Sequence, residues 1–453
     1  MEQKQFMLYG YSCPTDGSYF VDEQKFWTGT DYRTAERYAE YRDCGFNVLL
    51  HEGNDPYWGE PFETSNLKMV MDRAQSVGLK VLVYDRRIHD LSTHETLVGG
   101  EGLFADETEL EKYVLDCMKD YTKHPTFLGV QFIDEPNYRL FPTIGILYRL
   151  IKKHYPDAFV KVNLFPAVKW VKASFSPDEN LTVPQRYEQY MRSFLRETGA
   201  DYLMFDSYPM ARTNDYTYWI RPDHFDSLQV AVKLCKEKKI SLYVVAQTCS
   251  HSFQHYMCTR KVSRADMYWQ IHLLAGLGVR RIMYFTYWRK QMNRVEGEWF
   301  YNDGSSIMTQ TGERNPLYYW LKEIHTQLQR FAPILLEYRF SGLCFVRGAA
   351  NRADYANLYE TYELDSVRAA ECSREGIFVL TELEKTGSKL IMIENICDPE
   401  VHGGPEQIRV TFKGNIRQTF RIDGGKAIPA GGDSIELELR AGEAVFLDVE
   451  EAK

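Results

Sequence analysis

Apolar residues in the first 330 positions gather into short continuous runs, separated by segments with helical spacing. Continuous apolar runs are typical of parallel strands that are buried on both faces, and apolar residues recurring every three or four positions indicate amphipathic helices. The runs predict eight strands, at residues 6–11, 46–51, 80–84, 127–133, 159–164, 202–206, 241–246 and 281–287. The segments between them predict helices at about 33–43, 63–77, 107–123, 142–154, 184–198, 223–238 and 263–277.

This alternation predicts an α/β fold with a (β/α)₈ TIM barrel over residues 1–334. Glycines such as Gly45 and Gly199 stand just past the expected helix ends, where a left-handed residue often stops a helix. The competing fold is a doubly wound open sheet. It would carry a Gly-Xaa-Gly-Xaa-Xaa-Gly motif after the first strand, and the sequence has none there.

The pattern changes after an expected helix at about 315–331. Short alternating segments, for example at 377–380, 408–412 and 444–447, are separated by glycine-rich turns. Such segments are typical of antiparallel strands with one buried face. We therefore expect a small C-terminal antiparallel β-sandwich over residues 335–453, acting as an accessory domain.

Composition narrows the classes of partner. The net charge is −9, which argues against nucleic acid and anionic membrane, since both bind clustered basic surface. No apolar run reaches the roughly 18 residues of a membrane helix. The nine cysteines have no Cys-Xaa-Xaa-Cys spacing, which favours free thiols in a cytoplasmic protein. These features are compatible with a homo-oligomer.

The strongest chemical signal is Asp134-Glu135-Pro136, which closes the apolar run 127–133. It places two carboxylates at the carboxyl end of the fourth strand, where barrel enzymes keep their chemistry. Proline ends the strand and disfavours a helical conformation at Glu135, so we expect an extended turn there. A solvated surface turn is the alternative reading of the same three residues.

Other strands also end in polar or aromatic residues, and these ends should meet at one face of a barrel. Carboxylates and amides bind hydroxyl groups, while aromatic rings stack on the C–H face of a sugar. A carbohydrate is therefore the expected ligand. The predicted substrate-binding residues are Glu52, Asp85, Arg86, Asn163, Tyr208, Gln247 and Trp288, with Asp206 as a catalytic candidate beside Asp134 and Glu135.

The sequence predicts neither a metal nor a cofactor. His51, His251 and His255 do not fall into a His-Xaa-His or His-Glu-Xaa-Xaa-His spacing, which zinc sites use. A Gly-Xaa-Ser-Xaa-Gly elbow for serine chemistry is also missing.

Through most of residues 6–335 the sequence resembles the clan of (β/α)₈ glycoside hydrolases that includes β-galactosidases and β-glucanases. Three features carry the resemblance: the strand-4 acid Glu135, the Asp206-Ser207-Tyr208-Pro209 segment after strand 6, and Trp288 after strand 8. The resemblance implies that Glu135 is the acid/base and that Trp288 is a platform beneath the sugar.

One feature departs from that clan. Its nucleophile is a glutamate at the end of strand 7, where this sequence has Ala246-Gln247. A second carboxylate could come from Asp206, from Glu52, or from Glu296 and Glu298 after strand 8. Alternatively, the substrate supplies the nucleophile. Some hexosaminidases carry a similar adjacent Asp-Glu pair, which would make Asp134 the residue that orients an acetamido group.

The resulting hypothesis is a glycoside hydrolase that acts on a small glycoside or oligosaccharide, with Glu135 as general acid/base. Long loops after strands 2, 6 and 8 favour an exo-acting enzyme. The rival is a non-catalytic carbohydrate-binding barrel that has lost hydrolysis. A lyase or isomerase acting on sugar phosphates is disfavoured, because a glycine-rich phosphate loop after strands 7 and 8 is missing.

Overall fold

Eight parallel strands organise the N-terminal two thirds of the chain in the computed structural model. They are β1 (Met7–Gly10), β4 (Val48–Leu50), β5 (Lys80–Val83), β6 (Phe127–Asp134), β7 (Phe159–Asn163), β8 (Tyr202–Asp206), β11 (Ser241–Gln247) and β14 (Arg281–Phe285). The structure describes residues 5–21, 24–51, 56–213, 215–250, 252–254, 257–289, 291–295, 298–300, 306–357, 364–426 and 428–450.

The strands form two four-stranded parallel sheets, in the orders β4-β5-β6-β7 and β8-β11-β14-β1. Hydrogen bonds join the two sheets at both edges. Between β7 and β8, the Leu164 N–H donates to the Met204 oxygen over 2.9 Å. Between β1 and β4, the Asn47 N–H donates to the Leu8 oxygen over 3.0 Å. All eight strands therefore follow one another around a common core.

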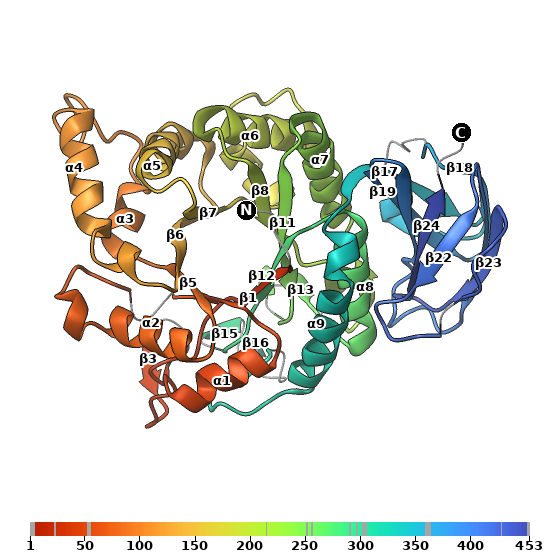
Figure 1. Cartoon of the computed structure of the whole chain (residues 1–453), viewed down its shortest axis with the longest axis horizontal. Coiled ribbons are helices and arrows are strands. Elements are labelled where there is room, and N and C mark those ends of the chain that lie inside the picture. The colour runs from red at the N-terminus through yellow and green to blue at the C-terminus, as the bar shows by residue number, and fades with distance from the viewer. Residues whose placement is uncertain are drawn as a thin grey trace.

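Helices surround these strands (Figure 1). Sequence signals fix their ends: in α6, Thr182 and Gln185 form a capping box, and Gly199 ends the helix with a φ of 68°. The helices are α1 (Ala35–Asp43), α2 (Asn66–Ser76), α3 (Arg86–Leu91), α4 (Glu107–Met118), α5 (Phe141–His154), α6 (Val183–Thr198), α7 (Pro222–Lys238), α8 (Arg264–Gly276) and α9 (Pro316–Leu335). None of the helices in the described part of the chain is long and apolar enough to cross a membrane.

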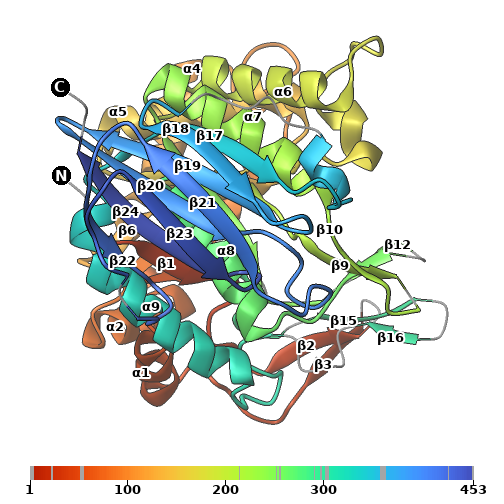
Figure 2. The same cartoon turned by 90° about the vertical axis from the view of Figure 1, so that its right-hand side faces the viewer.

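Two small sheets, which the sequence did not predict, grow from loops that follow the parallel strands. One has the order β10-β9-β13-β12 and the other β16-β15-β2-β3. Both project from the same side of the molecule (Figure 2). Their strands are β2 (Ser18–Val21), β3 (Gln24–Trp27), β9 (Met210–Thr213), β10 (Tyr218–Ile220), β12 (Ser252–Gln254), β13 (Met257–Thr259), β15 (Gln291–Val295) and β16 (Glu298–Phe300).

The C-terminal part contains two antiparallel sheets, in the orders β17-β19-β20-β24-β22 and β18-β21-β23. They enclose a shared apolar cluster that includes Phe378, Ile391 and Val410, which is the arrangement expected of a sandwich. The strands are β17 (Arg339–Arg347), β18 (Val367–Cys372), β19 (Ile377–Lys385), β20 (Ser388–Asn395), β21 (Glu406–Phe412), β22 (Ile416–Phe420), β23 (Ser434–Leu439) and β24 (Ala444–Glu450).

The five-stranded sheet has a second buried face. Val379, Met392 and Phe446 alternate with the sandwich residues along their strands and belong to the large core of the parallel-strand region. Phe331 of α9 stacks on Phe420 of β22 with ring centroids 4.5 Å apart. One sheet thus separates two apolar cores and holds the C-terminal part against α8 and α9.

Candidate active site

A cavity of about 190 Å³ lies at the carboxyl ends of the parallel strands. Side chains from β6, β7, β8, β11 and β14 meet there, because the carboxyl ends of parallel strands share one edge. The lining brings together five residues that the sequence predicted: Asp134, Glu135, Asn163, Asp206 and Tyr208. The remaining lining residues are Tyr11, Val245, Met283 and Phe285.

Glu135 occupies a strained turn immediately after β6. Its N–H donates to the Asn163 oxygen over 2.8 Å, which ties the turn to the end of β7. Its φ is 48°, in the left-handed region that non-glycine residues rarely adopt. The extended turn expected from Pro136 is therefore wrong at this residue. Strain of this kind is concentrated at functional sites, where the surrounding structure holds a side chain in place.

Asp206 lies at the end of β8 and is only 6 % exposed. Asn163 Nδ2 donates to its Oδ1 over 2.9 Å. The Glu135 carboxyl lines the same cavity, and the two carboxyl groups affect each other's pKa. Two like charges in a poorly hydrated site repel each other, which disfavours ionisation of both groups at once.

Burial and like charge decide which carboxyl keeps a proton. Burial raises the pKa of Glu135, and the charges of Asp206 and Asp134 raise it further, to about 10. Burial and the Asp134 charge also raise the pKa of Asp206, but hydrogen bonds from Asn163 and Glu135 limit the rise to about 6. At neutral pH, Glu135 therefore carries the proton and Asp206 is ionised.

Aromatic rings form one wall of the cavity. The ring centroid of Phe285 lies 5.1 Å from that of Tyr11 and 5.6 Å from that of Tyr208. Tyr208 was predicted as a binding residue, whereas Tyr11 and Phe285 were not. Their position at the ends of the first and eighth strands is the signal that would have identified them. A sugar ring could stack on such a wall through its C–H face.

Trp288, the predicted platform, does not line this cavity. It is 1 % exposed, and its ring packs against Tyr32 with centroids 4.8 Å apart. The reason is the length of the last parallel strand, which ends at Phe285 and not at the expected residue 287. Phe285 occupies the place that the sequence assigned to Trp288.

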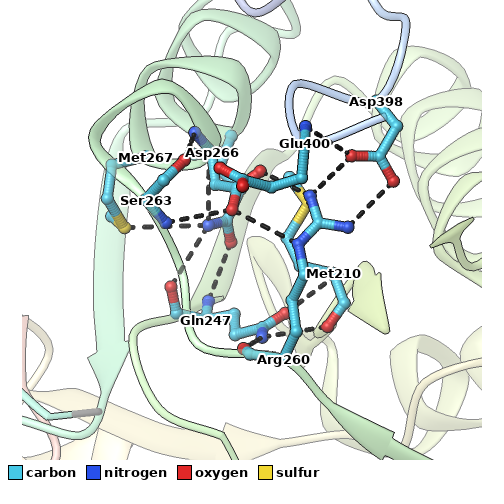
Figure 3. A network of polar contacts seen from close by, with 9 residues as sticks. Met210, Gln247, Arg260, Ser263, Asp266, Met267, Asp398 and Glu400 are labelled. Atoms are coloured by element: carbon cyan, nitrogen blue, oxygen red, sulfur yellow. Dashed lines mark hydrogen bonds and ion pairs between the residues drawn. The ribbon is translucent and has the colours of Figure 1, made fainter. Parts of the chain in front are cut away.

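Gln247 does not line the cavity either, although it was predicted to bind substrate. It is fully buried, and its side chain joins loop backbones (Figure 3). Its Oε1 accepts from the Met210 N–H over 2.9 Å, and its Nε2 donates to the Arg260 oxygen over 2.9 Å. The residue of β11 in the cavity lining is Val245 instead.

Asp85 and Arg86 lie outside the cavity lining as well. Asp85 is fully buried, caps the first turn of α3 and forms two hydrogen bonds with the Arg87 guanidinium, at 3.0 and 2.8 Å. Arg86 Nε lies 2.6 Å from Asp90 Oδ1, and its guanidinium carbon lies 5.5 Å from the centre of the Trp58 ring. Asp85 thus has a structural role at the helix start.

Several further candidates fall outside the described residues: Glu52, Glu296, His251 and His255. Glu298 belongs to β16. His51 is described and is buried at 2 % exposure. Within the residues that the structure describes, no three His, Cys, Asp or Glu side chains are grouped so that they could hold a metal ion.

The chain is similar to known proteins in its fold and not in its sequence. Searches with the sequence matched no protein-family model and no curated protein. The structure is similar to the α-amylase of Geobacillus thermoleovorans, solved with acarbose, with a TM-score of 0.54, 13 % identity and 100 % coverage of both chains. It is also similar to an Anoxybacillus α-amylase, with a TM-score of 0.53, 11 % identity and 99 % coverage of both chains.

A third similar structure is a family 39 glycoside hydrolase from Bacteroides cellulosilyticus WH2. The TM-score is 0.50 at 10 % identity, covering 99 % of this chain and 82 % of that one. At these identities the likeness concerns the fold alone. The chain therefore has the mixed α/β fold of solved glycoside hydrolases, and its chemistry has to be argued from its own residues.

Proposed function

We propose that the protein is a glycoside hydrolase in which Glu135 is the proton donor, with the eight parallel strands closed into a (β/α)₈ barrel. We take residues 1–334 as the catalytic domain and residues 335–453 as the accessory domain. The observation that carries the proposal is the Glu135–Asp206 carboxyl pair in a cavity at the strand ends. A glycosidic oxygen needs an acid that is still protonated near neutral pH, and this pair supplies one.

The first step uses the proton of Glu135. It passes to the glycosidic oxygen while the bond from that oxygen to the anomeric carbon breaks. Glu135 is then an anion beside the Asp206 anion, and like-charge repulsion makes it a stronger base than an isolated carboxylate. It is therefore suited to take a proton from the water that completes hydrolysis. Asp206 acts here through Glu135 and keeps its proton affinity high.

We assign the second catalytic role to Asp134. The carboxyl groups of a retaining pair lie about 5 Å apart, and those of an inverting pair about 6.5 to 9.5 Å. Among the described residues that line the cavity, Asp134 is the carboxylate left once Asp206 is taken as the group that keeps Glu135 protonated, and it is exposed. It can attack the anomeric carbon itself, or it can orient a substrate acetamido group whose carbonyl oxygen attacks.

The test compares the wild-type protein with Glu135→Gln and Asp134→Asn on nitrophenyl glycosides, including N-acetylhexosaminides. We expect turnover by the wild type and a loss of about 10²- to 10⁴-fold in Glu135→Gln, the usual contribution of a general acid. Turnover of acetamido sugars alone would assign the substrate's own group as nucleophile. Turnover of plain hexosides that is lost in Asp134→Asn would assign the attack to Asp134.

A carbohydrate-binding barrel without hydrolysis is the second candidate. The position of Val245 favours it, because β11 places an apolar side chain in the cavity and no carboxylate. This candidate predicts that the wild type binds a sugar without cleaving it and that Glu135→Gln changes nothing but affinity. Cleavage that depends on Glu135 would exclude it.

A further inference from the structure

Three exposed aromatic rings stand on loops at the carboxyl ends of the parallel strands, each with an arginine against it. They are Trp58, Trp170 and Tyr216, which are 62 %, 45 % and 67 % exposed. The loops follow β4, β7 and β8. Large aromatic rings lose free energy when they stay in water, so exposed rings around a candidate site call for an explanation.

Trp58 lies on the side of the cavity that Asp134 lines. Its neighbour Tyr57 bridges to Asp85 at the end of β5, which places Trp58 beside the start of α3. Arg86 of that helix lies against the Trp58 ring at 5.5 Å. The N–H of Ile133, the residue before Asp134, donates to Ser92 Oγ at the end of α3 over 3.0 Å. The helix whose Arg86 contacts the Trp58 ring therefore lies against the end of β6.

Trp170 lies on the side that Tyr208 lines. It belongs to the short helix η4 (Lys169–Ser174) after β7, and the Arg221 guanidinium carbon lies 5.3 Å from its ring centre. The Arg221 N–H donates over 2.9 Å to the oxygen of Pro209, the residue after Tyr208. Contacts therefore connect Trp170 to the segment that carries Tyr208, and Trp58 to the helix beside the end of β6.

Tyr216 is at the tip between β9 and β10. Arg212 lies 4.7 Å from its ring centre, and its φ is 62°, which a bulky side chain adopts at a cost of about 1–3 kcal/mol. Folding alone does not require an exposed ring in such a conformation. The strain, the exposure and the arginine together mark this tip, on the hairpin that follows β8, as a contact surface.

The arginines give these rings a fixed orientation. A guanidinium on an aromatic face is favourable by about 0.5–1 kcal/mol at an exposed site. Salt bridges hold two of the arginines in turn: Arg86 with Asp90 at 2.6 Å, and Arg221 with Asp223. A ring that is held before a ligand arrives loses less conformational entropy on binding.

We propose that Trp58, Trp170 and Tyr216 are stacking platforms for sugar residues outside the cavity. The substrate is then an oligosaccharide or polysaccharide chain that crosses the cavity, and the enzyme cleaves within that chain. The cavity, at about 190 Å³, is smaller than the about 300–1,000 Å³ of pockets that enclose drug-sized ligands. It takes about one sugar ring, so the rest of a chain has to lie on the rim. This inference deepens the proposed function, and it replaces the exo-acting enzyme expected from the loop lengths.

The experiment measures chain binding apart from hydrolysis. The Glu135→Gln protein is run through native gels that contain mixed-linkage β-glucan, xylan, galactomannan or soluble starch. Two double variants, which add Trp58→Ala or Trp170→Ala to Glu135→Gln, are run in the same gels. The control carries Tyr113→Ala, which removes an exposed ring on the helix α4 (39 % exposed). We expect at least one polysaccharide to retard Glu135→Gln. Each Trp→Ala change should raise the dissociation constant about tenfold, which corresponds to about 1.4 kcal/mol, and the control should leave it unchanged.

Parallel assays separate this inference from the proposed hydrolysis. With Glu135 intact, Trp58→Ala should cleave a small nitrophenyl glycoside at the wild-type rate while its kcat/KM on the retained polysaccharide falls about tenfold. Cleavage of small glycosides together with chain binding that neither Trp→Ala variant changes would overturn the inference and leave the hydrolase standing. Chain binding that depends on the tryptophans, without any cleavage, would support the stacking platforms and contradict the proposed hydrolysis. Circular dichroism checks that each variant is folded.

Discussion

Asn163 donates a hydrogen bond from its Nδ2 to the Oδ1 of Asp206 over 2.9 Å. The backbone oxygen of the same asparagine accepts the Glu135 N–H over 2.8 Å. One residue at the end of β7 therefore orients both members of the carboxyl pair, and it stabilises the charged form of only one of them. This asymmetry adds to burial and like charge in favouring Glu135 as the proton donor.

Replacing Asn163 should change the pH dependence of catalysis. The wild-type profile of kcat/KM should have an acid limb near pH 6, set by the pKa of Asp206, and a basic limb towards pH 10, set by Glu135. The Asn163 hydrogen bond lowers the pKa of Asp206, so Asn163→Ala should move the acid limb to higher pH and reduce the maximal rate. An acid limb that stays in place would mean that Asp206 does not control it.

Removing the half-buried acid Glu135 should stabilise the fold. The pKa of Glu135 is higher in the folded chain than in the unfolded one, so the folded state binds more protons and loses stability as the pH rises from about 4 towards 10. Glu135→Gln cannot titrate and should gain about 1–2 kcal/mol in unfolding free energy at pH 8, and less at pH 5. Urea unfolding at both pH values measures this. Glu135→Ala is a poor substitute, because it leaves a cavity.

Substitution of Phe285 should weaken substrate binding, whereas substitution of Trp288 should lower stability. Phe285→Ala removes a ring from the cavity wall, so we expect kcat/KM to fall about tenfold or more with little change in unfolding. Trp288→Ala removes a fully buried ring and should cost about 3–5 kcal/mol of stability. Kinetics and thermal unfolding of both variants test the assignment. The reverse pattern would restore Trp288 as the platform.

Loss of Arg260 should lower the unfolding free energy far more than loss of an exposed ion pair does. Arg260 is buried and binds Asp266 and Asp398, in each case with a nearest contact of 2.7 Å (Figure 3). Arg260→Met leaves the fully buried Asp266 without its cation, which should cost about 3–5 kcal/mol.

Arg264→Met is the matched control for this prediction. It breaks the exposed pair with Glu323, and the expected loss is below about 1 kcal/mol. Urea denaturation compares the two variants. Equal losses would mean that burial of the Arg260 network adds nothing to its strength.

The sequence predicted the parallel strands well because each is a continuous apolar run. The expected strand 202–206 is β8 itself. It also predicted which acids meet, because Asp134, Glu135 and Asp206 all follow such runs and strand ends share one edge. The eighth strand was less clear: Tyr284 to Trp288 is almost entirely aromatic, so hydrophobicity gave no sign that the strand ends at Phe285.

Two other features depend on contacts between distant residues, which a single sequence does not contain. Gln247 follows its strand just as Asp206 does, yet its amide bonds to the backbone of Met210 and Arg260. A polar side chain at a strand end looks the same whether a ligand or a distant loop satisfies it. The left-handed conformation of Glu135 likewise goes with its hydrogen bond to Asn163, a residue on the next strand.

The five-stranded C-terminal sheet has consequences for how the chain can be divided. Because Val379, Met392 and Phe446 complete the core of the preceding region, cutting the chain after α9 would leave an apolar wall of that core in water. The C-terminal part is thus no exchangeable module, and attaching it to another protein, or deleting it from this one, would be a change to the protein's own interior.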